Sequence, residues 1–259
     1  MKICVTGKGG SGKSMISALL AKSLAKEGYK VLVVDADESN LGLARMLGVP
    51  DNKETFMEHL GGKPAIRERL LSSLTRREGE PKAPILTEEQ IRTDDLPPEK
   101  LATANGIKLL KIGKIEHSLE GCACPIGALS RDFLTKLVPA EHEVVIADME
   151  AGIEHFGRGV DTAADVILAI VTPSYESVLL AEKIVQLGND INTRVVVILN
   201  NVSPELQRSL ESSLKERGIS AEASIRNDPV VFESCLKGES LEGVTAQEDV
   251  AKIVKVLGL

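Results

Sequence analysis

The chain has very few aromatic residues, and this shortage limits what it can bind. Among 259 residues, aromatic side chains make up 2% and tryptophan is absent. Proteins that hold single-stranded nucleic acid use aromatic side chains as stacking platforms, so this class of binding is disfavoured. The hydrophobic core is expected to consist of Val, Ile, Leu and Ala, and a hydrophobic fraction of 43% is enough for a substantial one.

An excess of positive charge is also missing. The formal net charge is −7, so we expect no nucleic acid and no anionic membrane surface among the partners. No apolar run is long enough to span a bilayer, and the first residues lead directly into a glycine-rich loop rather than a cleavable signal. We therefore expect a cytoplasmic protein whose four cysteines are reduced thiols.

Apolar runs alternate with helical patterns along the chain. This alternation predicts a single α/β domain over residues 1–259, with a mostly parallel central sheet and helices on both faces. The expected strands are 3–6, 30–35, 107–112, 143–148, 166–172, 194–200 and 221–225, and the expected helices are 13–27, 126–137, 174–188, 204–217, 229–237 and 246–257.

The stretch 62–106 departs from this pattern because it is rich in proline and charge. We expect it to be a surface excursion from the sheet, with a helix near 64–76 followed by irregular chain. Its role is either that of a solvated insertion or that of a docking surface for a client protein.

A glycine-rich loop follows the first expected strand and precedes the first expected helix. Its sequence fits G-x-x-x-x-G-K-S, the phosphate-binding loop of P-loop nucleoside triphosphatases. Glycines let backbone N–H groups point at a phosphate, and the helix N-terminus adds its positive end. We expect Lys13 to reach the β- and γ-phosphates and Ser14 to ligate Mg²⁺. The expected nucleotide-binding residues of this segment are Gly7, Lys8, Gly9, Gly10, Ser11, Gly12, Lys13, Ser14 and Met15.

Lys8 is an additional lysine within this loop. Lys13 already neutralises the phosphates, so an ordinary phosphate loop does not need a second lysine. Lys8 can project instead to the γ-phosphate of a nucleotide held by a facing subunit, which would couple ATP binding to closure of a homodimer. The alternative is a solvated loop lysine.

Acidic residues end two later strands, at the sheet edge where the phosphate loop is expected. Asp35 ends one strand, with Asp37 two residues further on, and Asp148 ends another. Acids at this edge can position the attacking water or organise the Mg²⁺ shell. Asp37 is therefore a candidate catalytic residue, and Asp35 and Asp148 are candidate Mg²⁺ ligands, either directly or through water. Gly152 can donate its N–H to the γ-phosphate and swing when that phosphate leaves.

Asn200 ends the expected strand 194–200. Its amide can both donate to and accept from the edge of a base. The chain has no N-K-x-D sequence, the usual guanine reader, so ATP is favoured over GTP. A plain strand-terminating role for Asn200 is the alternative.

Two cysteines, Cys122 and Cys124, lie one residue apart in an expected loop, 116–126. One C-x-C pair provides two thiolates, too few for a closed metal site, whereas two copies on a dimer axis provide four. Four sulfur ligands suit Ni²⁺, Zn²⁺ or an iron–sulfur cluster, and the pattern does not rank these. Such a site would favour the same closed dimer as ATP. The alternative is a pair of reduced thiols with no ligand.

Taken together, these motifs resemble the deviant phosphate-loop ATPases, a group that includes MinD, ParA and the nitrogenase iron protein. The resemblance rests on Lys8 within the loop, the strand ends at Asp35–Asp37 and Asp148–Gly152, residues 171–174, and Asn200. It implies a dimer with ATP sandwiched between facing subunits. Lys8 would cross to the partner's phosphates, and Asp37 would assist the attacking water.

The segments 120–125 and 148–159 resemble the CooC branch of this group. That resemblance implies a nickel-dependent ATPase that matures a client enzyme, carbon monoxide dehydrogenase or acetyl-CoA synthase. Cys122 and Cys124 would hold Ni²⁺ at the dimer axis. The segment 150–159 would relay the nucleotide state to the metal loop, which makes Glu150 and Gly152 the expected switch residues.

Two other classes of function stay open. One is a positioning switch like MinD or ParA, whose membrane-binding form needs a basic amphipathic tail. The last helical pattern mixes acids with lysines and fits core packing better. The other is an iron–sulfur carrier or electron donor, although related carriers use C-x-x-C. The segment 225–229 also departs from relatives that place an Ile-Pro lid over the adenine.

Overall fold

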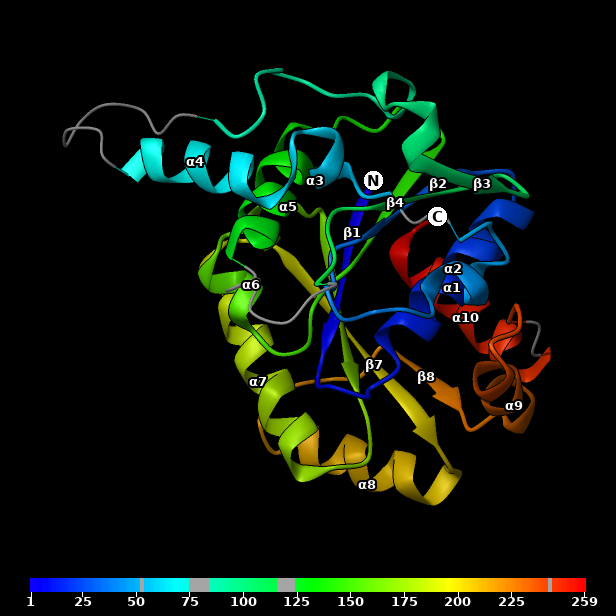
Figure 1. Ribbon diagram of the computed structural model, residues 1–259. Coiled ribbons are helices and arrows are strands. Elements are labelled where there is room, and N and C mark those ends of the chain that lie inside the picture. Colours follow the sequence, from blue (N-terminus) through cyan, green and yellow to red (C-terminus); the bar gives the residue numbers. More distant parts are fainter. Residues whose placement is uncertain (52–53, 75–83, 116–123, 242–243) are drawn as a thin grey trace.

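The computed structural model describes residues 1–51, 54–74, 84–115, 124–241 and 244–259. They form an eight-stranded sheet in the order β3-β4-β2-β5-β1-β6-β7-β8 (Figure 1). Every neighbouring pair among these strands is parallel except β3 with β4. The strands are β1 (Lys2–Gly7), β2 (Lys30–Asp35), β3 (Leu101–Ala104), β4 (Ile107–Lys111), β5 (Glu143–Asp148), β6 (Val166–Val171), β7 (Arg194–Val202) and β8 (Ala223–Arg226).

Helices cover both faces of this sheet (Figure 1). One face packs against α1 (Lys13–Lys26), α2 (Leu43–Leu47), α9 (Pro229–Lys237) and α10 (Val244–Leu257). The other packs against α3 (Phe56–His59), α4 (Gly62–Leu74), α5 (Cys124–Lys136), α7 (Tyr175–Asp190) and α8 (Pro204–Lys215). A short helix, α6 (Glu154–Gly157), and three 3₁₀ turns, Thr93–Asp95, Pro98–Lys100 and Asp161–Ala163, complete the elements.

The continuous apolar runs of the sequence follow from this two-sided burial. In β2, Val31 and Val33 belong to the core on the α1 side, whereas Leu32 and Val34 belong to the core on the α5 side. Because successive side chains of a strand point to opposite faces, a strand covered on both faces must be apolar at every position. The expectation of a mostly parallel sheet between two helical layers is confirmed.

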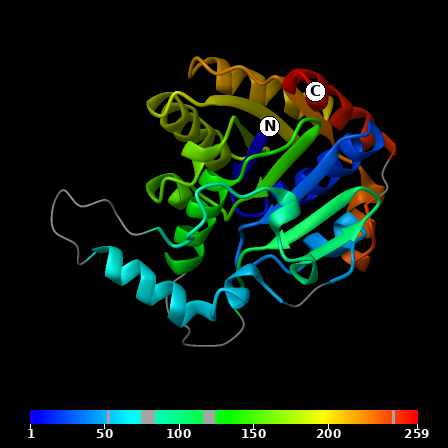
Figure 2. The ribbon, with the colours of Figure 1, turned by 90° about the horizontal axis from the view of Figure 1, so that it is seen from above.

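The stretch 62–106 contributes more to the domain than an excursion would. Figure 1 and Figure 2 place α4 at the periphery, as the expected helix near 64–76 implies. However, Ile66 and Leu86 are fully buried in the core. The stretch also contains β3, which is not among the strands expected from the sequence. The β3–β4 turn consists of Asn105 and Gly106, with φ of 51° and 80°, the left-handed geometry that favours this dipeptide.

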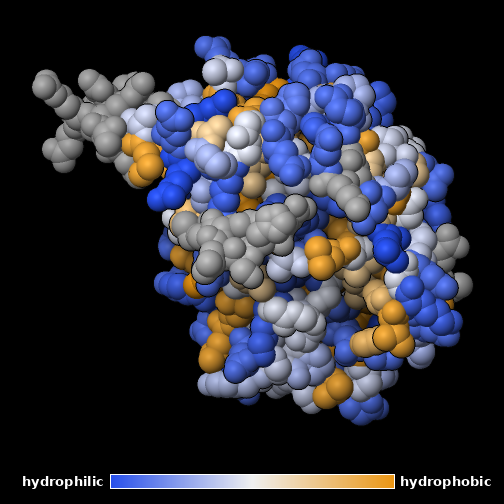
Figure 3. Space-filling view, in the orientation of Figure 1, coloured by the Kyte–Doolittle hydropathy of each residue, from blue (hydrophilic) through white to orange (hydrophobic). Residues whose placement is uncertain are grey.

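The face shown in Figure 3 is mostly hydrophilic, with apolar side chains in small separate groups. Within the described part of the chain, we find no helix that is both long and apolar enough to cross a bilayer.

Candidate functional site

The phosphate loop connects β1 to α1 at the carboxyl edge of the sheet. Gly12 caps α1 with a φ of 89°, a conformation that L side chains rarely adopt, and it offers no side-chain cap to the helix. The first-turn N–H groups of α1 are therefore left for a bound anion. A side chain at position 12 would also collide with Asn200, because a Cβ there would lie 2.4 Å from the Asn200 Nδ2 atom.

A cavity of about 480 Å³ extends from this loop, a volume within the range of ligand pockets. It reaches from the loop to α9 and the end of β8. Of the residues expected at the nucleotide, those that line it are Gly9, Gly10, Ser11, Gly12, Lys13, Ser14, Met15, Asp37 and Asn200. The strand β7 continues to Val202, two residues beyond the expected end, and Asn200 lies at the phosphate loop as the sequence predicts. Residues 225–228, which belong to the segment that departs from the Ile-Pro lid, also line the cavity.

Asn200 holds the phosphate loop in place. Its Nδ2 atom donates to the Ser11 carbonyl over 2.7 Å, and the side chain is buried. Its Oδ1 atom is buried without a hydrogen-bond partner among the described residues. A buried acceptor at a cavity wall fits a donor brought by a ligand, such as the amino group of adenine.

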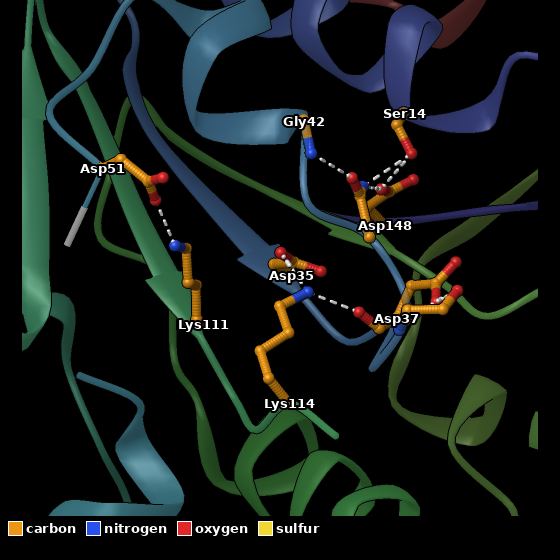
Figure 4. Close-up of polar contacts among 10 residues, drawn as sticks. Ser14, Asp35, Asp37, Gly42, Asp51, Lys111, Lys114 and Asp148 are labelled. Atoms are coloured by element: carbon orange, nitrogen blue, oxygen red, sulfur yellow. Dashed lines mark hydrogen bonds and ion pairs between the residues drawn. The ribbon is translucent and has the colours of Figure 1, made fainter. Parts of the chain in front are cut away.

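Ser14 and Asp148 form the polar cluster expected for Mg²⁺ (Figure 4). The Ser14 hydroxyl donates to Asp148 Oδ2 over 2.6 Å, and Ser17 donates to Asp148 Oδ1 over 3.2 Å. Asn40 joins them by donating from Nδ2 to Ser14 Oγ (2.8 Å) and to Asp148 Oδ2 (2.9 Å). Burial raises the pKa of Asp148, opposed by the Ser14 hydrogen bond and the charge of Lys13. A hydroxyl and a carboxylate are the oxygen ligands that Mg²⁺ prefers, so these residues fit the ion.

Asp35 and Asp37 end up in different environments (Figure 4). The Asp35 carboxylate is buried and forms an ion pair with Lys114, whose Nζ lies 2.7 Å from Oδ2. Burial raises the pKa of Asp35 to about 7, and the Lys114 charge opposes this rise. Asp37 lines the cavity, and its Oδ1 accepts from the N–H (2.9 Å) and hydroxyl (2.6 Å) of Ser39. Direct ligation of Mg²⁺ by Asp35 stays a prediction.

Lys8 is ion-paired with Glu176 of its own chain, at the start of α7. Lys13 is buried at the base of the loop, and its Nζ lies 3.5 Å from the Lys8 carbonyl. The two lysines of the loop therefore lie in different surroundings. The crossing of Lys8 to a partner subunit stays a prediction.

The segment expected to act as a switch begins with Glu150. Glu150 is ion-paired with Arg158, and burial raises its pKa while Arg158 opposes the rise. Gly152 has a φ of 95°, and its N–H donates to the carbonyl of Gly7 over 3.1 Å. The Gly152 N–H must therefore leave Gly7 before it can reach a γ-phosphate.

A buried histidine anchors the same segment. His155 lies with Nε2 2.8 Å from the Thr6 hydroxyl and Nδ1 2.8 Å from Asp161 Oδ2. Both His155 and Asp161 are 1% exposed. The Gly152 carbonyl lies 3.2 Å from His155 Nε2 and accepts from the Thr6 hydroxyl over 3.4 Å, so His155 ties both itself and Gly152 to β1. His155 lies within the segment 148–159 but has no ligand spacing to another histidine, so its sequence position does not predict this anchoring role.

Cys124 is the first residue of α5 and is exposed. Cys122 lies outside the described residues, so the metal loop 116–126 is visible only from position 124 onward. Among the residues that the structure describes, we find no group of three or more potential metal ligands. The first turn of α5 lies against the segment 150–159, which we call the switch segment. Gly127 and Arg158 are so close that a Cβ on Gly127 would lie 2.6 Å from Arg158 Cδ.

These features define a P-loop nucleotide-binding protein, and the chain belongs to the CbiA family, the CobQ/CobB/MinD/ParA nucleotide binding domain, whose model matches residues 2–241. It is an ATP-binding protein of the MinD/ParA type. It is 45% identical over 256 residues to an uncharacterized ATP-binding protein of Methanocaldococcus jannaschii, covering 98% of this chain and 99% of the relative.

A second relative is the carbon monoxide dehydrogenase accessory protein CooC of Rhodospirillum rubrum. It is 37% identical over 202 residues, which cover 78% of this chain and 74% of CooC. Among solved structures, the septum site-determining protein MinD of Pyrococcus horikoshii, complexed with Mg-ADP, has a TM-score of 0.66. The match covers 99% of this chain and 96% of MinD at 18% identity, and it confirms the fold.

Proposed function

We propose that the chain is a homodimeric, Mg²⁺-dependent ATPase that delivers Ni²⁺ to a client enzyme, carbon monoxide dehydrogenase or acetyl-CoA synthase. Similarity to the accessory protein CooC suggests the client. The observation that carries the proposal is structural: the helix that begins at Cys124 contacts Arg158, which is ion-paired with Glu150, and the next residue, Ala151, lines the cavity at the phosphate loop.

The phosphate loop performs the binding step. Its backbone N–H groups and Lys13 neutralise the triphosphate, and Ser14 with Asp148 would hold Mg²⁺, which adds positive charge beside the β- and γ-phosphates. Asp37 lies at the cavity wall, where it can orient the attacking water. Because Ser39 already donates two hydrogen bonds to Asp37 Oδ1, the carboxylate is held in one orientation.

Dimer closure would bring Lys8 from Glu176 to the phosphates of the facing subunit. The same closure would bring two copies of Cys122 and Cys124 to the symmetry axis, where four thiolates can bind Ni²⁺ as cargo. Each ligand then favours the closed state, so ATP and Ni²⁺ raise each other's affinity. Hydrolysis or client docking opens the dimer and releases the ion.

Metal analysis of the anaerobically purified protein tests this proposal. With a non-hydrolysable ATP analogue, we expect about one Ni²⁺ per dimer, and the double variant Cys122→Ala/Cys124→Ala should lose this ion while still binding nucleotide. Cys4→Ala, which removes a thiol buried within β1, is the matched control. Unchanged nickel content in the double variant would refute the assignment. A preference for Zn²⁺, or a brown preparation that contains an iron–sulfur cluster, would show that the cargo is not Ni²⁺.

A further inference from the structure

Lys114 is a lysine with a largely covered side chain, and no motif predicts it. It follows β4 by three residues, just before the segment that leads to the cysteines, and its side chain is 8% exposed. A buried lysine is costly unless its ammonium group is paired, so its partners show what the position is for.

The ammonium group of Lys114 bridges Asp35, the last residue of β2, and Asp37, which follows the strand (Figure 4). One contact is the ion pair with Asp35 at 2.7 Å. The other is a hydrogen bond to the backbone carbonyl of Asp37 at 2.5 Å. Neutralising Asp35 requires only the first contact, so the second indicates an additional role.

The Asp37 carbonyl belongs to a turn that reaches the Mg²⁺ cluster. It also accepts from the N–H of Asn40 over 3.3 Å. The Asn40 side chain in turn donates to both Ser14 and Asp148. Lys114 therefore fixes the backbone between Asp37 and Asn40. Asp37 is expected to orient the attacking water, and Asn40 contacts the expected ligands of Mg²⁺.

The chain around Lys114 is itself held on two sides. The N–H of Ile112 donates to the Asp35 carbonyl over 3.0 Å. On the opposite side, a Cβ on Gly113 would lie 3.2 Å from Ile126 Cγ1, in the first turn of α5. Residues 112–114 thus lie between the β2 end that leads into the Asp37 turn and the helix that begins at Cys124.

We propose that Lys114 is a positioning residue for ATP hydrolysis, which holds the Asp37 turn through its carbonyl from the segment that leads into the cysteine loop. The proposal rests on the Asp37 role given under the proposed function. It does not depend on which metal the cysteines carry.

The test replaces Lys114 by methionine, which keeps the length of the side chain and removes the donor. We expect ATP affinity to stay within about twofold of wild type and the single-turnover hydrolysis rate to fall about tenfold to a hundredfold. Lys111→Met is the matched control, because Lys111 lies on the same strand end and pairs with Asp51 at 2.5 Å, away from the Asp37 turn (Figure 4). An equal rate loss in both variants, or none in either, would overturn the proposal.

A double-mutant cycle separates positioning from charge neutralisation. If Lys114 serves only to neutralise Asp35, Lys114→Met should have no further effect on the rate in an Asp35→Asn background. If Lys114 holds the Asp37 carbonyl, it should lower the rate by a similar factor in both backgrounds, and Lys114→Arg should recover part of it. All rates are measured with Mg²⁺ and no other metal. A wild type without ATPase activity would instead contradict the proposed function itself.

Discussion

Lys8 of the phosphate loop forms an ion pair with Glu176 of α7 in the same chain. The Lys8 side chain is 39% exposed and that of Glu176 is 73% exposed. Exposed ion pairs are weak, so the contact is released readily. If Lys8 crosses to a facing subunit as proposed, the ion pair competes with dimer closure, because one ammonium group cannot serve both partners at once.

The first prediction concerns this competition. Glu176→Gln removes the charge that retains Lys8, so we expect ATP-dependent dimerisation to tighten about twofold to fivefold. Sedimentation velocity in the presence of a non-hydrolysable ATP analogue measures the dimer dissociation constant. Glu182→Gln is the control, because Glu182 lies on the same helix and pairs with Arg217 instead. Identical constants for the two variants would show that Glu176 does not restrain Lys8.

The second prediction concerns the contact between α5 and the switch segment. In Gly127→Ala the new methyl group would displace Arg158, and with it the Glu150 ion pair. We expect Ni²⁺ affinity to lose its dependence on the bound nucleotide, whereas ATP binding is retained. Alanine favours a helix by about 1 kcal/mol over glycine, so the change does not act by weakening α5.

Gly157 provides the control for this variant. A Cβ on Gly157 meets no atom within 4 Å, although the residue lies in the same switch segment. The measurement is the ratio of Ni²⁺ dissociation constants with a non-hydrolysable ATP analogue and with ADP. A ratio that is the same for Gly127→Ala and Gly157→Ala would argue against a relay through Arg158.

The third prediction concerns stability against pH. Burial raises the pKa of Asp35 to about 7, whereas an unfolded aspartate has a pKa of about 3.9. Between these values the folded state binds more protons, so the contribution of Asp35 to stability is full at low pH and is lost as the pH rises through 7.

We therefore expect wild type to lose about 2 kcal/mol of unfolding free energy relative to Asp35→Asn between pH 5 and pH 8. Urea titrations of both proteins across this range measure the difference. Asp51→Asn, at a half-exposed carboxylate, should follow the wild-type profile. Parallel profiles for wild type and Asp35→Asn would mean that Asp35 keeps an ordinary pKa.

The parts of the fold and site that follow local rules were predictable from the sequence. The phosphate loop is a contiguous motif, and strands such as β5 are unbroken apolar runs that end in a carboxylate. The Asn200 position was also predictable, because parallel strands end at the same edge. The hydrogen bond from Asn200 to the Ser11 carbonyl was not predictable, because it depends on how closely β7 approaches the loop.

Other features depend on contacts between distant segments. Asn40 and Lys114 contact Asp148 and Asp37 at the carboxyl edge of the sheet only because of the tertiary arrangement, and neither has a sequence signature. The β3 strand is different, because the Asn105-Gly106 dipeptide is a recognised hairpin signal. Proline and charge in the surrounding stretch obscured it.

The strands at the two sides of the sheet have a consequence for assembly. Both β3 and β8 are four residues long, and short outer strands give another chain little backbone to pair with. Lateral growth of the sheet into a filament is thereby discouraged. The dimer of the proposed function would instead form through the surface that carries the nucleotide pocket, where association could be reversed with each round of nucleotide exchange.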